Sequence, residues 1–210
     1  EISLFKITPD IDDGEIISTE RFELTPTDNI QTSHIKCASV LARSVFAIFQ
    51  NPIVMENGKK QSGIVSYFPK RTPEDGFIDW NMSVLSIHNQ IRALTDPYPN
   101  SRTVIDKSTV LIKRSVPIHC DIKYTPGLVV DVDILSDRSL LIAGKDGLLL
   151  IEDFHIKDRD FQIFPGSMCQ SRSIKDTAGI IIERFKKEFP GKNINQSLIN
   201  FWRGCGVQSF

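Results

Sequence analysis

Two short runs at the start of the chain alternate between apolar and polar positions, the pattern of a half-buried β-strand. They cover residues 3–7 and 16–24, and the acidic stretch DIDDGE at 10–15 separates them. Acidic side chains cap backbone amides in turns, and Gly14 relaxes the backbone there. The pattern therefore predicts a strand, a tight turn and a second strand.

Two longer segments carry apolar residues at steps of three and four, the period of an α-helix. The first begins near Asp28, which has capping-box spacing to Gln31, and Pro52 ends it. The second runs from about residue 83 to 94, and two prolines directly after it enforce an extended exit. The predicted apolar faces are Ile30, His34, Cys37, Leu41, Val45 and Ile48 in the first helix, and Val84, Ile87, Ile91 and Leu94 in the second.

Beyond residue 100 the pattern changes to short β-type runs, which at this close spacing are typical of a small barrel. The KDG sequence at 145–147 suits a hairpin turn, because Asp-Gly accepts the positive φ that a tight turn demands. A helical stripe returns from residue 174 to 189, and Gly191 suits the end of that helix. The expected strands lie at 110–114, 127–134, 140–143 and 148–151.

Composition adds few constraints on function. The 210 residues carry a net charge of −1, and no apolar run approaches the roughly 20 residues of a membrane helix. The scattered cysteines and histidines show no metal-ligand spacing, so we expect reduced thiols, no metal and a cytoplasmic protein. The first residue is Glu rather than Met, so we expect that an N-terminal piece is absent from this sequence. The cysteines are Cys37, Cys120, Cys169 and Cys205, and the histidines are His34, His88, His119 and His155.

Three stretches carry a resemblance to a known family. They are EISLFKI at 1–7 with DIDDGEII at 10–17, RTPEDGFIDW at 71–80 with IRALTDPYP at 91–99, and the strand-rich region 127–151. Together they resemble the folate-dependent formyltransferases, which include methionyl-tRNA formyltransferase and the sugar-nucleotide N-formyltransferases. Where that family usually has Gly-Ala after Pro-Tyr-Pro, this chain has Asn100 and Ser101, and Asn tolerates positive φ better than most residues.

The resemblance implies an α/β fold. Residues 1–100 would be the C-terminal portion of a doubly wound, Rossmann-like formyltransferase domain that lacks its N-terminal part. Residues 101–166 would form a small OB-like β-barrel, and 167–210 a helical tail that matches nothing in the family.

The resemblance also implies a reaction, the transfer of a formyl group from N10-formyltetrahydrofolate to a primary amine. The family uses an Asn, a His and an Asp, and only the Asp has a counterpart here, Asp12. In the family's order the other two residues and a folate-seating loop precede Glu1. The competing interpretation is that Asp12 is a turn residue that caps backbone amides.

The acceptor amine is less constrained. Acidic residues slightly outnumber basic ones between 105 and 165, which favours an amino-sugar nucleotide over tRNA, because phosphate contacts dominate affinity for nucleic acid. Methionyl-tRNA formyltransferase, a non-catalytic remnant that acts as a binding module, and catalytic residues supplied by another chain stay open as alternatives, as does a homo-oligomer.

Several residues have both a functional and a structural interpretation. Tyr98 is the candidate for binding the acceptor, and Trp80 could stack on a nucleobase or close a domain junction. Arg71 could hold an anion, although we favour a structural role. Asp79 and Asn81 are expected to cap the helix that follows them.

Overall fold

The computed structural model describes residues 1–10, 12–63, 67–121, 123–134, 138–158 and 161–192. The chain divides into two compact units, Glu1–Val65 and Ser66–Phe210. The second unit includes residues on both sides of positions 100 and 166, where the sequence predicted boundaries. The division into 1–100, 101–166 and 167–210 stays a prediction.

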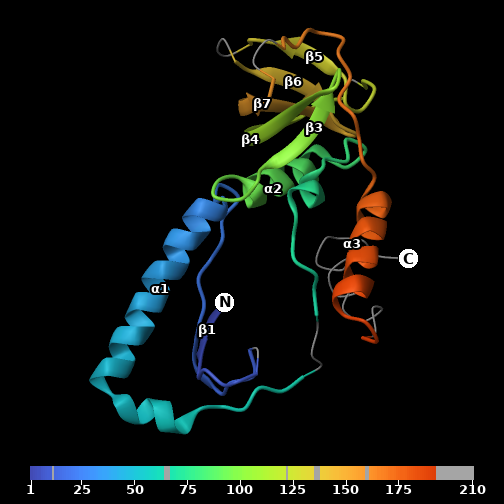
Figure 1. The fold of residues 1–210 in the computed structure, drawn as a ribbon. Helices are drawn as coiled ribbons and strands as arrows, with labels where there is room; N and C mark the ends of the chain where they lie inside the picture. The colour runs from blue at the N-terminus through green and yellow to red at the C-terminus, as the bar shows by residue number, and fades with distance from the viewer. Residues whose placement is uncertain (11, 64–66, 122, 135–137, 159–160, 193–210) are drawn as a thin grey trace. The chain divides into compact units, whose positions relative to one another are not determined.

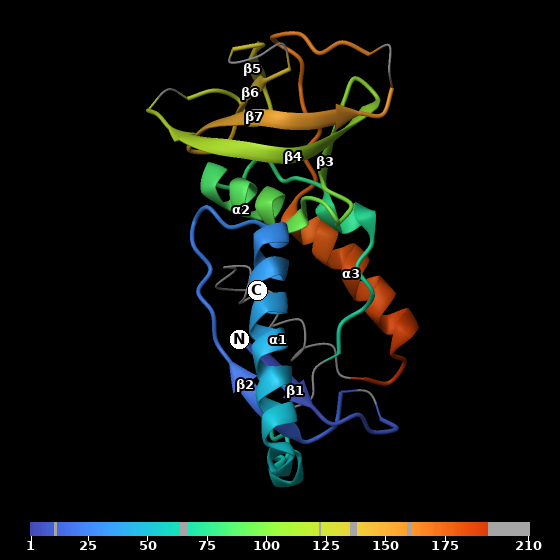
Figure 2. The ribbon, with the colours of Figure 1, turned by 90° about the vertical axis from the view of Figure 1, so that its left-hand side faces the viewer.

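The first unit pairs two strands next to one long helix. Strands β1 (Ile2–Phe5) and β2 (Ile16–Glu20) are antiparallel. Helix α1 (Ile30–Gln50) runs beside them, and the short 3-10 helix η1 (Pro52–Asn57) follows it (Figure 1 and Figure 2). The predicted strand, turn, strand and helix are thus confirmed. Because the described pair is antiparallel, the doubly wound parallel sheet stays a prediction.

The start of α1 differs from the predicted cap by one position. The cap is Asn29, whose side-chain oxygen accepts a hydrogen bond from the Thr32 backbone N–H at 3.0 Å. The Thr32 hydroxyl in turn accepts from the Asn29 N–H at 2.9 Å. The predicted capping box of Asp28 with Gln31 is therefore wrong, and the reciprocal bonds of that motif are made by the next residue pair.

The buried face of α1 is also shifted from the predicted stripe. Val40 and Ser44 are its buried residues, whereas Leu41 and Val45 of the predicted face are 37% and 38% exposed. Several large apolar side chains of this unit consequently lie on its surface. Part of them line a groove of about 400 Å³, formed by Leu4, Phe5, Ile17, Val45, Ile48, Phe49, Pro52 and Met55.

The second unit is built on a five-stranded antiparallel sheet. Its strand order is β3-β4-β7-β6-β5, which Figure 1 shows in green to orange. The bounds are β3 (Ser101–Ile105), β4 (Ser108–His119), β5 (Val129–Val132), β6 (Leu140–Ala143) and β7 (Gly147–Ile156). Every strand expected from the sequence is present, and β3 is an additional one. A turn joins β6 to β7 as predicted, but neither Asp146 nor Gly147 has the positive φ that was expected there, and Gly147 is already the first residue of β7.

The two outer strands of this sheet are not paired with each other in the described part of the chain. Instead, the segment after β7 bonds to both sides. Gly166 donates its N–H to the Val129 carbonyl at 2.8 Å, and Gln170 donates to the Val104 carbonyl at 2.7 Å. The sheet is therefore linked at its edges by a bridging segment, and a closed OB-like barrel stays a prediction.

Helix α2 (Val84–Leu94) packs against the sheet with the predicted face. Ser83 caps it by accepting from the Ser86 N–H at 3.1 Å. Each fully buried aliphatic side chain stabilises such a core by about 1.5–3 kcal/mol. The core consists of Ile78, Trp80, Val84, Ile87, Ile91, Ile105, Val110, Ile112, Val129, Leu140, Ile142, Leu149, Ile151 and Cys169.

Two further elements complete the second unit. A 3-10 helix, η2 (Pro73–Gly76), precedes α2, and helix α3 (Ile174–Glu188) follows the sheet. The predicted helix near 174–189 is thus confirmed, with Ser173 as its cap. Among the described residues no helix has the length and apolar character needed to cross a bilayer.

Candidate functional site

Asp12 lies in the turn between β1 and β2, and it is exposed. Its backbone has a φ of 53°, in the left-handed region where Asp and Asn are among the few non-glycine residues found. The Gln61 side chain donates hydrogen bonds to the carbonyl oxygens of Asp12 (2.8 Å) and Gly14 (2.7 Å). The turn is therefore held through its backbone, and the Asp12 carboxylate is accessible to solvent and to other groups.

Gly14 is the residue on which this turn depends. It is buried, and a Cβ added there would collide with the carbonyl of Lys6. The Lys6 N–H bonds to the Glu15 carbonyl at 3.0 Å, and the Lys6 ammonium pairs with the Glu15 carboxylate at 2.6 Å. The spacing of Asp12 to Gly14 thus has a local steric cause that is independent of any catalytic role.

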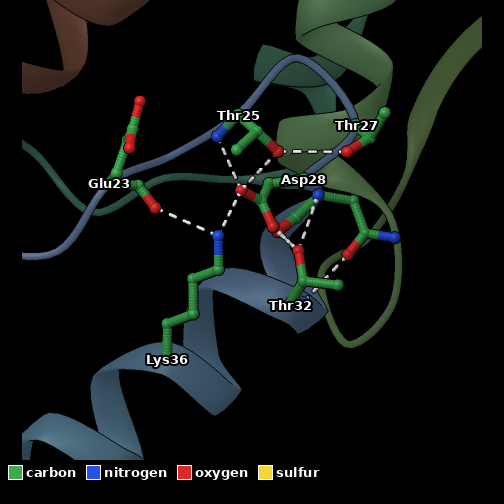
Figure 3. Close-up of polar contacts among 7 residues, drawn as sticks. Glu23, Thr25, Thr27, Asp28, Thr32 and Lys36 are labelled. Carbon is green, nitrogen blue, oxygen red and sulfur yellow. Dashed lines mark hydrogen bonds and ion pairs between the residues drawn. The ribbon is translucent and has the colours of Figure 1, made fainter.

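Helix α1 is fixed at its start by a buried carboxylate (Figure 3). Asp28 accepts from the Thr25 N–H and from the Lys36 ammonium, both at 2.6 Å. The same ammonium donates to the Glu23 carbonyl at 3.0 Å. The Lys36 contact and the Thr25 amide hold the pKa of Asp28 well below its usual range. These contacts give Asp28 a structural role at the entry to α1.

Tyr98 lies in the turn that leads from α2 to β3, and 43% of its surface is exposed. Its backbone N–H donates to the Thr95 carbonyl at 3.1 Å. Asn100, which replaces the family's usual glycine, has a φ of 63°, so the expectation that Asn accommodates this turn is confirmed. Tyr98 belongs to the second unit and Asp12 to the first. A role for either in binding or catalysis stays a prediction.

Trp80 does not offer its ring to a ligand. The side chain is fully buried in the core, and its indole N–H donates to the Thr103 hydroxyl at 3.2 Å. Its backbone N–H donates to the Ser171 hydroxyl at 2.9 Å. The nucleobase-stacking alternative is therefore wrong, because a ring with no exposed face cannot stack on a ligand. Trp80 lies in the core of the second unit, and its place at a domain junction stays a prediction.

Asp79 has a different partner from the predicted one. Its carboxylate accepts from the N–H of Ile174, the first residue of α3, at 3.0 Å, and from the Ser171 hydroxyl at 3.1 Å. It also accepts from the Asn81 N–H at 3.0 Å. Because Ser83 caps α2, the expectation that Asp79 and Asn81 cap that helix is wrong. Asp79 instead ties the start of α3 to the chain before α2.

A second carboxylate of the same stretch is clamped by an arginine from α3. Arg184 donates two hydrogen bonds to Asp75, at 2.8 and 2.9 Å, and Asp75 also accepts from the Thr72 N–H at 2.8 Å. Burial alone would raise the pKa of Asp75, but Arg184 and the Thr72 amide outweigh it and lower that pKa. Bidentate contacts of this kind are among the stronger hydrogen bonds in proteins.

No local sequence pattern predicts this cluster. Asp75 and Arg184 are 109 positions apart, and no local periodicity connects them. The only indication was that residues 71–80 contained an unusual density of charged and aromatic side chains. Arg71, in that stretch, is exposed, and its charge contributes to lowering the pKa of Asp75.

Comparison with known sequences places the second unit in a described domain family. Residues 70–166 match the family model described as "Formyl transferase, C-terminal domain". A methionyl-tRNA formyltransferase from Gluconacetobacter diazotrophicus is 30% identical over 149 residues, which are 71% of this chain and 47% of that protein. The bifunctional polymyxin resistance protein ArnA from Wigglesworthia glossinidia brevipalpis is 30% identical over 139 residues, 64% of this chain and 21% of that protein. The chain thus spans half or less of the length of these relatives.

Solved structures show the same fold. HypX from Aquifex aeolicus, in complex with tetrahydrofolic acid, matches 88% of this chain and 30% of its own, with a TM-score of 0.54 and 17% identity. An N-formyltransferase from Helicobacter canadensis, in complex with folinic acid and dTDP-3-aminofucose, matches 73% of this chain and 55% of its own. Its TM-score is 0.52 and its identity 23%. At these identities the likeness concerns the fold alone.

Proposed function

This chain belongs to the formyl transferase family, and we propose that it serves the transfer of a formyl group from N10-formyltetrahydrofolate to a primary amine. The observation that carries the proposal is the match of residues 70–166 to the family's C-terminal domain, together with the methionyl-tRNA formyltransferase relative. Support for the folate donor comes from the tetrahydrofolic acid and folinic acid in two of the similar structures.

The proposed role of Asp12 follows from what the reaction requires. The attacking amine must be uncharged, so a group must accept or hold its proton, and the tetrahedral oxyanion at the formyl carbon needs a donor. A carboxylate orients an imidazole and favours its cationic form as the proton moves. Asp12 is exposed, and its backbone carbonyl accepts a hydrogen bond from Gln61, which suits a carboxylate that acts on a partner group outside its own hairpin.

No such partner group contacts Asp12 among the described residues of the first unit, so we propose that a further protein segment supplies it. The apolar groove beside α1 supports a larger catalytic domain, because open apolar surface of this kind marks a face that other protein covers. The relatives, of which this chain matches 47% and 21% of the length, support the same proposal. The alternative is a remnant without catalysis, in which this face binds a different protein.

For the acceptor, we favour an amino-sugar nucleotide, with Tyr98 as its candidate contact. The excess of acidic residues between 105 and 165 disfavours a polyanion such as tRNA. The Helicobacter canadensis structure, which holds dTDP-3-aminofucose, supports a sugar nucleotide. The methionyl-tRNA formyltransferase relative keeps the tRNA alternative open.

The test of Asp12 is the Asp12→Asn variant of the complete protein. Asn tolerates the left-handed backbone of this turn, so the fold should be retained while the carboxylate is lost. We expect the rate of formyl transfer to fall by about a hundredfold or more, the contribution typical of general acid–base groups. Asp13→Asn, which removes a neighbouring exposed carboxylate, is the control and should keep its activity. Unchanged turnover in the Asp12 variant would remove this residue from the mechanism.

The acceptor is tested with the complete, unsubstituted protein in a formylation assay that offers it amino-sugar nucleotides and methionyl-tRNA. We expect turnover with an amino-sugar nucleotide. Turnover with methionyl-tRNA, combined with a steep loss of tRNA affinity as salt is raised, would contradict that preference. No formylation of any amine by the complete, folded protein would favour the binding-module alternative.

A further inference from the structure

The chain after the sheet packs against one particular stretch of the second unit, Tyr67 to Trp80. The match to the family's C-terminal domain covers residues 70–166, so it includes most of this stretch but not the chain after residue 166 that packs against it. At the end of α3 this packing is aromatic. The ring centroids of Tyr67 and Phe189 are 5.5 Å apart, and those of Phe185 and Phe189 are 5.2 Å apart. The contacts therefore reach the first described residue of the unit.

The centre of the contact is the arginine clamp. Besides its two bonds to Asp75, Arg184 donates to the Thr72 hydroxyl at 3.0 Å and to the Lys70 carbonyl at 2.8 Å. The side chains of Asp75 and Arg184 are 3% and 18% exposed. One guanidinium thus binds three residues of the stretch at once, from a position largely shielded from solvent.

The beginning of the tail contributes a second polar anchor. Arg172 donates to the carbonyl and the carboxylate of Glu74, at 3.0 and 3.2 Å, and its guanidinium lies 4.2 Å from the centre of the Phe77 ring. With the Asp79 contact to Ile174, the tail holds the stretch at both ends and in the middle.

Helix α3 nevertheless stands apart from the core of the sheet. Its buried side chains are Ala178, Ile181 and Phe185, and none of them belongs to the core cluster. Within the described residues the tail contributes only Cys169 to that cluster, from the segment before α3. The polar and aromatic contacts described above join the helix to the 67–80 stretch, and losing them removes no α3 residue from the core cluster.

We propose that α3 is a latch: it closes over the stretch from Tyr67 to Trp80 and opens together with η2 as one local unit, while the sheet stays folded. Cooperative local units of this kind open at free energies below that of global unfolding. The Arg184–Asp75 clamp sets how often the latch opens, because breaking it leaves a shielded carboxylate without its charge partner.

The test is amide hydrogen exchange on the full chain, with wild type compared to Arg184→Gln. The reporters are the amides of Asp75 and Phe77, which bond within η2, the amides of α3, and those of β4 and β7. Loss of a charge-assisted clamp should accelerate exchange in η2 and α3 together by about tenfold or more and leave β4 and β7 unchanged.

Two further variants complete the test: one that weakens the clamp only in part, and one that serves as the control. Arg184→Lys keeps the charge but loses the bidentate geometry, so its acceleration should be intermediate. Lys186→Gln removes an exposed pair with Glu183 on the same helix and should change nothing. Equal acceleration in β4 and β7 would overturn the latch, because α3 would then be part of one cooperative core. Unchanged exchange in η2 of the Arg184 variants would overturn it as well.

Discussion

At Gly14 the space that a side chain would occupy is already taken by the backbone of Lys6. Gly14→Ala must therefore push β1 and β2 apart or break the bond from the Lys6 N–H to the Glu15 carbonyl. Overpacking of this kind typically costs about 1–3 kcal/mol. We expect faster amide exchange at Lys6 and along β1, measured on the full chain.

A matched substitution separates the steric effect from the general effect of replacing glycine. Gly179→Ala places a methyl group where no neighbour lies within 4 Å, in the interior of a helix. Ala stabilises a helix interior over Gly by about 1 kcal/mol, so this variant should be neutral or more stable. Normal protection of β1 in the Gly14 variant would show that the hairpin relaxes around the methyl group.

Residue-level predictions succeeded where the determining contacts are local. Asn100 adopts the positive φ that its amide side chain permits, and Gly14 lies in the expected turn. Prediction failed at Asp79, which bonds to Ile174, 95 positions away. The spacing of Asp28 to Gln31 fits a capping box, but the Asp28 carboxylate accepts hydrogen bonds from Lys36 and Thr25 instead.

At the scale of elements, the β6–β7 hairpin also fixes the start of α2. Asp146, in the hairpin turn, accepts from the N–H of Val84 at 2.8 Å. The amides in the first turn of a helix lack partners within the helix, so this carboxylate satisfies one of them from outside. The turn therefore aligns the helix with the sheet as well as reversing the chain.

Asp146→Ala should destabilise the second unit by about 1 kcal/mol, the usual effect of removing a helix cap. Asp146→Asn keeps an acceptor oxygen and a residue suited to the turn, so its effect should be smaller. Lys145→Ala is the control, because the contact of Lys145 is made by its backbone N–H, which donates to the carbonyl of Met82 just before α2 and is kept in the variant. Urea unfolding followed by circular dichroism measures all three, and equal stabilities would show that the cap contributes nothing.

The positions of the helices and strands were largely predictable from the sequence, whereas the residues that each helix buries were less so. Helix α2 presents the predicted side chains because it packs on one sheet, which selects a single stripe. Helix α1 has apolar residues on several sides, so periodicity alone could not distinguish Val40 from Leu41. The bridging segment after β7 was not predicted, since its bonds join residues such as Gln170 and Val104 that are distant in sequence.

At the scale of the whole molecule, the two units differ in how much apolar surface they bury. Among the described residues of the first unit, Val40 is the single buried hydrophobic side chain, and Phe46 and Phe49 are 63% and 79% exposed. The second unit contains a continuous core of fourteen buried residues. Such a contrast identifies the second unit as the stable part of this chain, because burial of apolar surface is the main stabilising term in folding.

The two units should therefore behave differently when they are separated. A polypeptide of residues 66–210 should fold alone, and its sheet should unfold in urea in one cooperative transition. Residues 1–65 should lack stable structure, because isolated helices are marginal in water and so small a unit buries too little surface. Circular dichroism with urea titration of each piece measures this.

The outcome also bears on the proposed reaction. If residues 1–65 fold cooperatively by themselves, the exposed face of α1 does not require covering protein and does not indicate a larger catalytic domain. If residues 1–65 fold only when a catalytic segment of a related formyltransferase is added, that segment covers the exposed apolar face of α1. In that event Asp12 gains neighbours that the hairpin alone does not provide, and its carboxylate can be tested there in its proposed role.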